Sequence, residues 1–219
     1  MTRWGVLFDV DGTLVDSNYL HIVAWLRAFR SAGYADVTAA QVHRCVGMGG
    51  ELLLETLVGS VDEAAKKGHS VEYERLWPEL RPFPGAVDLL REVRRRGGAA
   101  VLATSATEEE AGALRKALDC DDVITAITSS ADVEEAKPNP DIFRTALDKS
   151  GIDPARCVVV GDTVYDVEAA TRAGLRCVGV LTGGISRAEL AEAGAVEVYE
   201  SVAALLAAFD QSPLGALSG

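Results

Sequence analysis

Short apolar runs alternate with longer segments of helical spacing along most of the chain. The apolar runs are typical of buried strands and cover residues 4–8, 99–103, 123–127, 157–160 and 177–181. The segments between them favour helices over residues 86–96, 108–118, 141–149, 164–173, 188–193 and 202–209. Strands that are apolar throughout and separated by helices predict an α/β fold, with a parallel sheet covered by helices on both faces. We expect the tail after residue 211 to fray.

Residues 17–81 interrupt this alternation, because they show helical character and no strand pattern. Within them, Thr38 with Gln41 three residues later has the spacing of a capping box at a helix start. The turn-rich Pro82-Phe83-Pro84-Gly85 marks the return to alternating strands and helices. The pattern therefore predicts two domains, an α/β core of residues 1–16 and 82–219 and a helical domain of residues 17–81.

The composition narrows the choice of partners. The 219 residues carry a net charge of −12 and no basic stretch, which argues against a nucleic-acid partner. No apolar run approaches the ~20 residues of a membrane span, and the apolar N-terminal stretch is too short for a signal peptide. The cysteines are widely spaced, so we expect buried thiols in a reducing cytoplasm at Cys45, Cys120, Cys157 and Cys177.

Two carboxylates, Asp9 and Asp11, directly follow the first predicted strand. In an extended chain, side chains two residues apart point to the same side. Gly12 and Thr13 come next, where the chain can turn and offer backbone N–H groups to an anion. Two close carboxylates repel each other unless a cation or a shared proton relieves them. The segment therefore indicates a metal-dependent site for an anionic group, with one aspartate available to attack it.

Polar side chains also follow the later strands, and in a parallel sheet such positions meet at one edge. They are Thr104, Ser105, Lys137, Asp162 and Asp166. A hydroxyl from Thr104 and a backbone N–H from Ser105 can bind phosphate oxygens, although either residue could instead cap the helix predicted from residue 108. Lys137 offers a compact cation to the same anion or to Asp9. A site that offers a small number of carboxylates, whose oxygens are hard ligands, suits Mg²⁺, because this ion keeps several of its waters.

In this order the motifs resemble the haloacid dehalogenase superfamily of phosphohydrolases. Four segments carry the resemblance: Asp9-Val10-Asp11-Gly12-Thr13 through Ser17, Leu102-Ala103-Thr104-Ser105, Lys137-Pro138-Asn139-Pro140 through Phe143, and Val160-Gly161-Asp162-Thr163 through Asp166. The family has a Rossmann-like core. The helical insertion is similar to the small cap found in its phosphoglycolate phosphatase and β-phosphoglucomutase branch.

The resemblance implies a role for each matching residue. Asp9 would be the nucleophile that forms an aspartyl-phosphate, and Asp11 the general acid and then the base. Mg²⁺ would be held by the Asp9 carboxylate, the Asp11 backbone carbonyl and Asp162, while Asp166 would support the waters of the metal. The phosphoryl oxygens would be held by Thr104, Ser105 and Lys137.

His21 lies twelve positions after Asp9, where the β-phosphoglucomutase branch has a histidine that assists the acid/base aspartate. The alternative is a structural histidine between cap and core. Segment 47–50 stands where this branch keeps its specificity loop, and it has no basic residue of its own, although Arg44 is near. The Gly161-Asp162 pair also differs from the Glu-Asp pair of the mutases, so both features favour a phosphatase.

The resemblance thus predicts a Mg²⁺-dependent phosphatase for a small phosphorylated metabolite, of the phosphoglycolate or sugar-phosphate type. The first alternative is a sugar-phosphate mutase. A dehalogenase or phosphonatase is disfavoured by Asp11, which those enzymes usually lack. A non-enzymatic binding module on this fold is expected to have lost one of Asp9, Asp11, Lys137 or Asp162, and all four are present.

Overall fold

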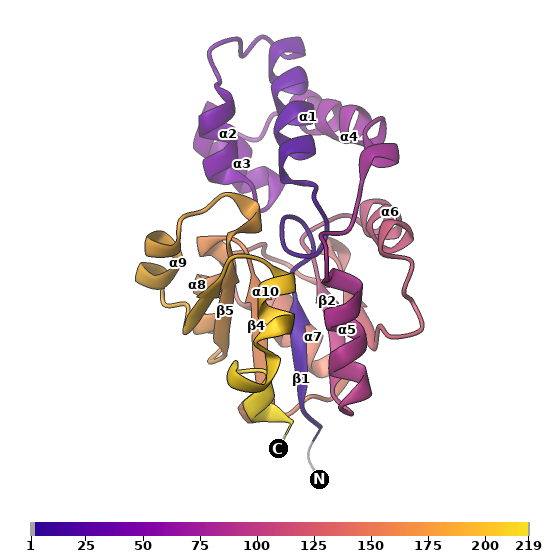
Figure 1. Ribbon diagram of the computed structural model, residues 1–219. Helices are drawn as coiled ribbons and strands as arrows, with labels where there is room; N and C mark the ends of the chain where they lie inside the picture. The colour runs from indigo at the N-terminus through magenta and orange to yellow at the C-terminus, as the bar shows by residue number, and fades with distance from the viewer. Residues whose placement is uncertain (1–2, 219) are drawn as a thin grey trace. The chain divides into compact units, whose positions relative to one another are not determined.

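The computed structural model describes residues 3–218, and its core is a six-stranded parallel sheet of order β3-β2-β1-β4-β5-β6 (Figure 1). The strands are β1 (Gly5–Phe8), β2 (Ala99–Ala103), β3 (Ala126–Thr128), β4 (Cys157–Gly161), β5 (Arg176–Val180) and β6 (Glu197–Tyr199). β1 is central and pairs with β2 on one side and β4 on the other, with Leu7 opposite both Val101 and Val159. The carboxyl ends of β1, β2 and β4 therefore lie side by side, which confirms the predicted α/β fold.

Helices cover both faces of this sheet. They are α5 (Ala86–Arg95), α6 (Glu108–Leu118), α7 (Asp141–Ser150), α8 (Val164–Arg172), α9 (Arg187–Ala193) and α10 (Val202–Ala207). Side chains of α7, α8 and α9 pack with Leu7, Val101 and Val159 in one buried cluster. α5 and α10 pack against each other, and Figure 1 shows them on the face turned away from α7. Burial on both faces explains why the strands are apolar throughout.

The described chain divides into two compact units, and one of them is the segment Ser17–Leu80. It contains α1 (Asn18–Ser31), α2 (Ala39–Cys45), α3 (Gly50–Val58), α4 (Glu63–Glu74) and a 3-10 turn, Trp77–Glu79. Trp25, Phe29 and Leu54 are central to its own buried apolar cluster. α2 starts at the predicted capping box, with the Thr38 side chain accepting from the Gln41 amide and the Gln41 side chain accepting from the Thr38 amide.

Two sequence predictions are wrong in detail, and one strand was missed. β3 begins at Ala126 rather than at residue 123, because residues 121–123 form a turn. β6 was not predicted, since a three-residue, partly exposed strand carries no periodicity signal. The tail does not fray: Leu214 and Leu217 are buried, and the Leu217 carbonyl accepts from Arg156 at 2.7 Å.

All four cysteines are free and buried, as expected from their spacing. Burial raises the pKa of the Cys157 thiol to about 12. The pKa of Cys177 is also raised, mainly by burial. Because the thiolate is the reactive form, these two side chains act as small apolar groups of the core.

Gly85 and Gly97 offer a matched test of packing in the core unit. Both have φ close to 80°, but a Cβ at Gly85 would lie 2.9 Å from the Ala203 Cα, whereas none of the described atoms lies within 4 Å of a Cβ at Gly97. Each change to alanine should cost about 1 kcal/mol of unfolding free energy from the backbone. Gly85→Ala should cost roughly 1–3 kcal/mol more from overpacking against α10. Urea denaturation measures both values, and equal losses would contradict the packing argument.

Candidate active site

The loop after β1 presents two aspartates at the carboxyl edge of the sheet. The Asp9 amide donates to the Val160 carbonyl at 2.9 Å, which continues the β1–β4 pairing one residue beyond β1. The chain then turns back, and the Leu14 and Val15 amides both donate to the Val10 carbonyl at 2.9 Å. Gly12, with φ of 76°, makes this reversal possible because a left-handed backbone is strained for other residues. Asp9 is consequently buried, while Asp11 is half-buried.

Lys137 joins the first aspartate to the helix that follows β4. Its side chain is 1% exposed, and its Nζ forms an ion pair with Asp9 and lies 2.7 Å from Asp166 Oδ1. Burial alone would lower the pKa of Lys137, but the carboxylates of Asp166 and Asp9 raise it above its ordinary value. The ammonium therefore stays charged at neutral pH, in contact with two carboxylates from different elements.

Both oxygens of Asp166 are engaged by protein groups. Thr163 donates to Asp166 Oδ2 from its amide at 3.1 Å and from its hydroxyl at 2.6 Å, which forms a capping box at the start of α8. Asp166 Oδ1 faces Lys137. The side chain also packs over Gly161, where a Cβ would lie 2.5 Å from the Asp166 Cβ. Asp166 is thus fixed as the partner of Lys137, a contact that the sequence did not reveal.

Asp162 is buried and turned toward the β1 loop. Its Oδ1 accepts a hydrogen bond from the Thr13 hydroxyl at 2.8 Å, and both residues are fully buried. Thr13 was considered from sequence only as part of a turn, so its contact with Asp162 was missed. The Thr163-x-x-Asp166 spacing, in contrast, is a readable capping-box signal.

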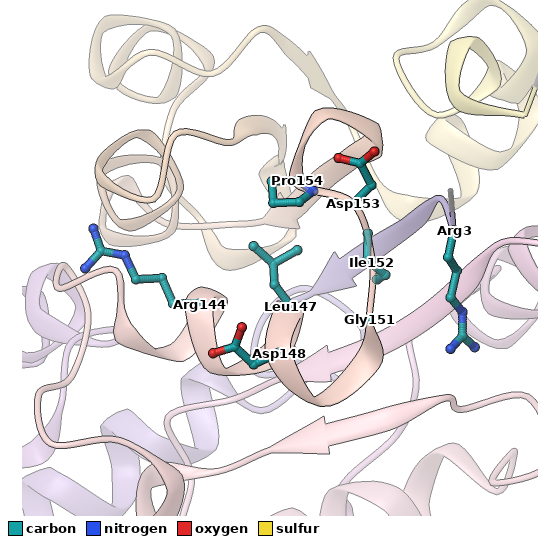
Figure 2. Close-up of a pocket in the computed structure, with 8 residues that line it drawn as sticks. All are labelled: Arg3, Arg144, Leu147, Asp148, Gly151, Ile152, Asp153 and Pro154. Carbon is teal, nitrogen blue, oxygen red and sulfur yellow. The ribbon is translucent and has the colours of Figure 1, made fainter. Parts of the chain in front are cut away.

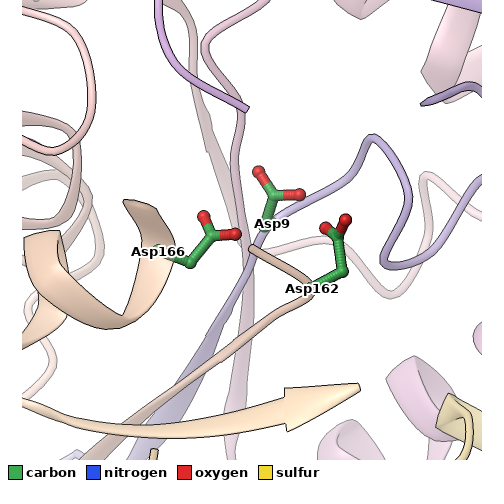
Figure 3. A group of neighbouring side chains, drawn as sticks. All are labelled: Asp9, Asp162 and Asp166. Atoms are coloured by element: carbon green, nitrogen blue, oxygen red, sulfur yellow. The ribbon is translucent and has the colours of Figure 1, made fainter. Parts of the chain in front are cut away.

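Asp9, Asp162 and Asp166 together form a group that could hold a metal ion (Figure 3). Each offers a carboxylate oxygen, and these oxygens lie within 4.8 Å of one another. The ammonium of Lys137 brings one positive charge to this group, against Asp9 and Asp166. Burial raises the pKa of Asp9 to about 7, with Asp166 and Asp11 adding to the rise and Lys137 opposing it. A divalent cation, which prefers hard oxygen ligands, fits this group of carboxylates.

The loop after β2 brings Thr104 to the second aspartate. The Thr104 hydroxyl donates to Asp11 Oδ2 at 3.3 Å and accepts from the Ala106 amide at 3.1 Å. Ser105 is half-buried in the same turn. The alternative that Thr104 or Ser105 caps α6 is wrong, because the cap is Thr107, whose hydroxyl accepts from the Glu110 amide.

His21 lies in the helical unit, on α1. Its Nδ1 is 3.1 Å from Nε2 of His69, and its ring stacks on Tyr73 with centroids 3.8 Å apart. The His69 ring stacks in turn on Trp25, at 4.1 Å. His21 is therefore held in a defined orientation by α4, whichever role it has.

A separate surface pocket of about 440 Å³ contains none of the predicted site residues (Figure 2). Leu147 and Ile152 line it between Arg3 and Asp148. Ile152 precedes β4 and Arg3 precedes β1, so this pocket lies at the amino ends of the strands, at the opposite edge from Asp9. No helix among the described residues is long and apolar enough to cross a membrane.

The α/β fold and the site of aspartates around Lys137 can be compared with those of known proteins. The chain belongs to the haloacid dehalogenase-like hydrolases, whose family model matches residues 6–180. A phosphoglycolate phosphatase of Rhodospirillum rubrum is 30% identical over 213 residues, which cover 91% of this chain and 88% of that protein. A phosphorylated carbohydrates phosphatase of Thermotoga maritima is 32% identical over 203 residues, covering 89% of this chain and 93% of that one.

Among solved structures, a hydrolase from Pseudomonas syringae aligns with a TM-score of 0.90 at 36% identity, covering 95% of this chain and 99% of that chain. These similarities confirm the predicted family and fold. They extend over almost the whole chain, so the helical unit and the core unit both have counterparts in the relatives.

Asp9→Asn is expected to stabilise the metal-free protein at neutral and higher pH. Because the folded pKa of Asp9 is raised from 3.8 to about 7, the folded protein binds this proton more tightly than the unfolded chain does. The wild type therefore loses stability as the pH rises through this range, and the amide avoids the loss. In EDTA above the folded pKa, the variant should unfold at least about 2–4 °C higher, the shift that 1 kcal/mol produces. The difference should shrink toward acidic pH, and thermal melts that show a pH-independent gap would contradict it.

Proposed function

We propose that this hydrolase is a Mg²⁺-dependent phosphatase that cleaves a small phosphomonoester through an aspartyl-phosphate. The observation that carries the proposal is the contact of buried Asp9 with Lys137, beside Asp11 and Asp162. A carboxylate next to a fixed ammonium can approach a phosphoryl group whose negative charge the ammonium also attracts. The named relatives, both phosphatases, support the same reaction.

Asp9 is the proposed nucleophile. Its carboxylate oxygen attacks phosphorus, the phosphorus–oxygen bond to the substrate breaks, and the phosphoryl group is transferred to Asp9. Lys137 keeps its proton, because Asp166 and Asp9 raise its pKa, and it holds phosphoryl oxygens together with Thr104 and Ser105. Asp166 positions the ammonium and takes no part in bond changes.

Asp11 is the proposed proton carrier. It donates a proton to the departing alcohol oxygen and then accepts one from the water that attacks the aspartyl-phosphate. That second attack breaks the bond between Asp9 and phosphorus and releases inorganic phosphate. The half-buried carboxyl and its hydrogen bond from Thr104 suit this role, because Asp11 is held at the carboxyl edge of the sheet and is still partly accessible to substrate and water.

Mg²⁺ is the proposed cofactor, held by the carboxylates of Asp9 and Asp162 and the backbone carbonyl of Asp11. When bound, it supplies positive charge that offsets repulsion between Asp9 and a phosphate dianion. Asp166 already has both oxygens engaged, so it supports the waters of the ion rather than binding the ion directly.

The substrate is proposed to be a small phosphorylated acid or sugar, since the two relatives are named for phosphoglycolate and for phosphorylated carbohydrates. We further propose that residues 17–81 form a cap domain that selects it. Segment 47–50 and His21 are the parts of this domain that we expect to contact substrate. Because segment 47–50 has no basic residue, a second phosphate would lack a partner there, which favours a phosphatase over a mutase.

Asp9→Asn should abolish hydrolysis of every ester in a panel that includes phosphoglycolate, hexose phosphates and an aryl phosphate, because the amide is not a nucleophile. Phosphate release with Mg²⁺, and without it in EDTA, measures the effect. Asp148→Asn is the matched control, since it removes an exposed carboxylate in the pocket at the opposite edge, and its activity should equal that of the wild type. Turnover by the Asp9 variant would refute the mechanism. A requirement for a bisphosphate activator would favour the mutase.

Asp11→Asn should separate the two half-reactions. An aryl phosphate has a leaving group that needs no protonation, so transfer to Asp9 should continue, whereas attack by water should lose its base. Phosphate release should slow by about 10²–10⁴-fold, and a phosphorylated protein should accumulate. Intact-mass spectrometry after acid quenching detects it. If the variant neither accumulates a phosphoenzyme nor loses activity, Asp11 is not the proton carrier.

A further inference from the structure

A single side chain ties the Asp11 loop to the loop after β5. Thr182, in the 3-10 turn Leu181–Gly183, donates from its hydroxyl to the Gly12 carbonyl at 2.6 Å. In the sheet, β4 lies between β1 and β5. The hydrogen bond therefore connects the loops on either side of β4, at the end of the strand that leads into Asp162.

This contact holds the Gly12–Thr13 peptide from its carbonyl side, in addition to the backbone bond that the Thr13 amide makes. The Gly12 amide donates to the Val15 carbonyl, and the amides of Thr13, Leu14 and Val15 donate to the Val10 carbonyl, that of Thr13 at the longer distance of 3.3 Å. Those bonds fix amides and the carbonyls of Val10 and Val15, whereas the Gly12 carbonyl is engaged by Thr182. Because Gly12 has no side chain and a φ of 76°, its backbone has more freedom than that of other residues.

The Gly12 carbonyl belongs to the same planar peptide as the Thr13 nitrogen, so fixing the first orients the second. Thr13 in turn donates its hydroxyl to Asp162 Oδ1. A continuous path thus runs from Thr182 through Gly12 and Thr13 to Asp162. The Asp11 carbonyl belongs to the preceding peptide, whose Gly12 amide donates to the Val15 carbonyl at 2.9 Å.

We propose that Thr182 is a positioning residue for the cation site, and this rests on the proposed binding of Mg²⁺ by Asp9, Asp11 and Asp162. Its hydroxyl helps to hold the Gly12–Thr13 peptide, and Thr13 in turn holds the Asp162 carboxylate through Oδ1. Groups that orient metal ligands without touching the metal typically contribute about 10–100-fold to affinity. Thr182 supplies this function from a loop outside the four motifs that define the site.

Thr182→Val tests the proposal, because it keeps the shape of the side chain and removes the donor. Titration calorimetry with MgCl₂ alone should give a dissociation constant about 10-fold or more above that of the wild type. Thr182→Ser retains a hydroxyl and should restore binding close to the wild-type value. Thr171→Val is the matched control: it removes a hydroxyl-to-carbonyl bond of 2.8 Å within α8, in the same unit, and should leave affinity unchanged.

A double-mutant cycle with Thr13→Val tests the path itself. If Thr182 acts through Thr13, the double variant should lose much less affinity than the product of the two single losses. Thermal melts in EDTA check that each variant is folded, and Thr182→Ala replaces the valine variant if that one is not.

Two failures are distinguishable. A wild type that binds no Mg²⁺ refutes the proposed function. A wild type that binds Mg²⁺ with an affinity matched by a folded Thr182→Val or Thr182→Ala variant refutes only the role of Thr182. Independent, multiplicative losses in the cycle would overturn the path through Thr13.

Discussion

The buried ammonium of Lys137 is the constraint on which the site depends. A charge removed from water is tolerated in a protein interior only when it is paired and hydrogen-bonded. Its partners, Asp9 and Asp166, come from the β1 loop and from the start of α8, and the lysine itself comes from the loop after β3. The pairing is possible only when these strand ends lie in the order β3-β2-β1-β4. The site therefore forms only when the strands of the sheet pair in this order.

The charges around Lys137 do not balance, and this imbalance gives the site its chemistry. Three buried carboxylates lie close together, and the ammonium pairs with two of them, Asp9 and Asp166. The pKa of Asp9 is raised to about 7 by burial and by its acidic neighbours. An ionised Asp9 therefore lowers the stability of the folded protein at this site, a cost that is common at functional sites. In the proposed mechanism a divalent cation would relieve the repulsion between the carboxylates, while the ammonium would retain its attraction for an anion. The same arrangement thus favours binding of a metal and of a phosphoryl group together.

The two units separate chemistry from recognition in our proposal. The core unit contains Asp9, Lys137 and Asp162 on a rigid parallel sheet, whereas the segment Ser17–Leu80 has its own apolar core around Trp25 and Phe29. Because each unit has a core of its own, changes in the helical unit can alter substrate choice while the carboxyl edge of the sheet stays intact. The fixed stack of His21, His69 and Tyr73 shows that this unit also presents ordered polar groups.

The sequence by itself determined most strands and the helices, because apolar runs and helical spacing are local patterns. It also determined the convergence of Asp9, Thr104, Lys137 and Asp162, because each follows a predicted strand and the carboxyl ends of parallel strands meet at one edge. The capping box at Thr38 could also be predicted, because its two residues, Thr38 and Gln41, are three positions apart in the chain. Only the tertiary structure decided three contacts: the ion pair of Asp166 with Lys137, and the hydrogen bonds from Thr13 to Asp162 and from Thr182 to the Gly12 carbonyl. It also decided that β6 and the tail are ordered, since each depends on β5 or on the core rather than on its own pattern. Such contacts join residues far apart in the chain, and no short-range periodicity records them.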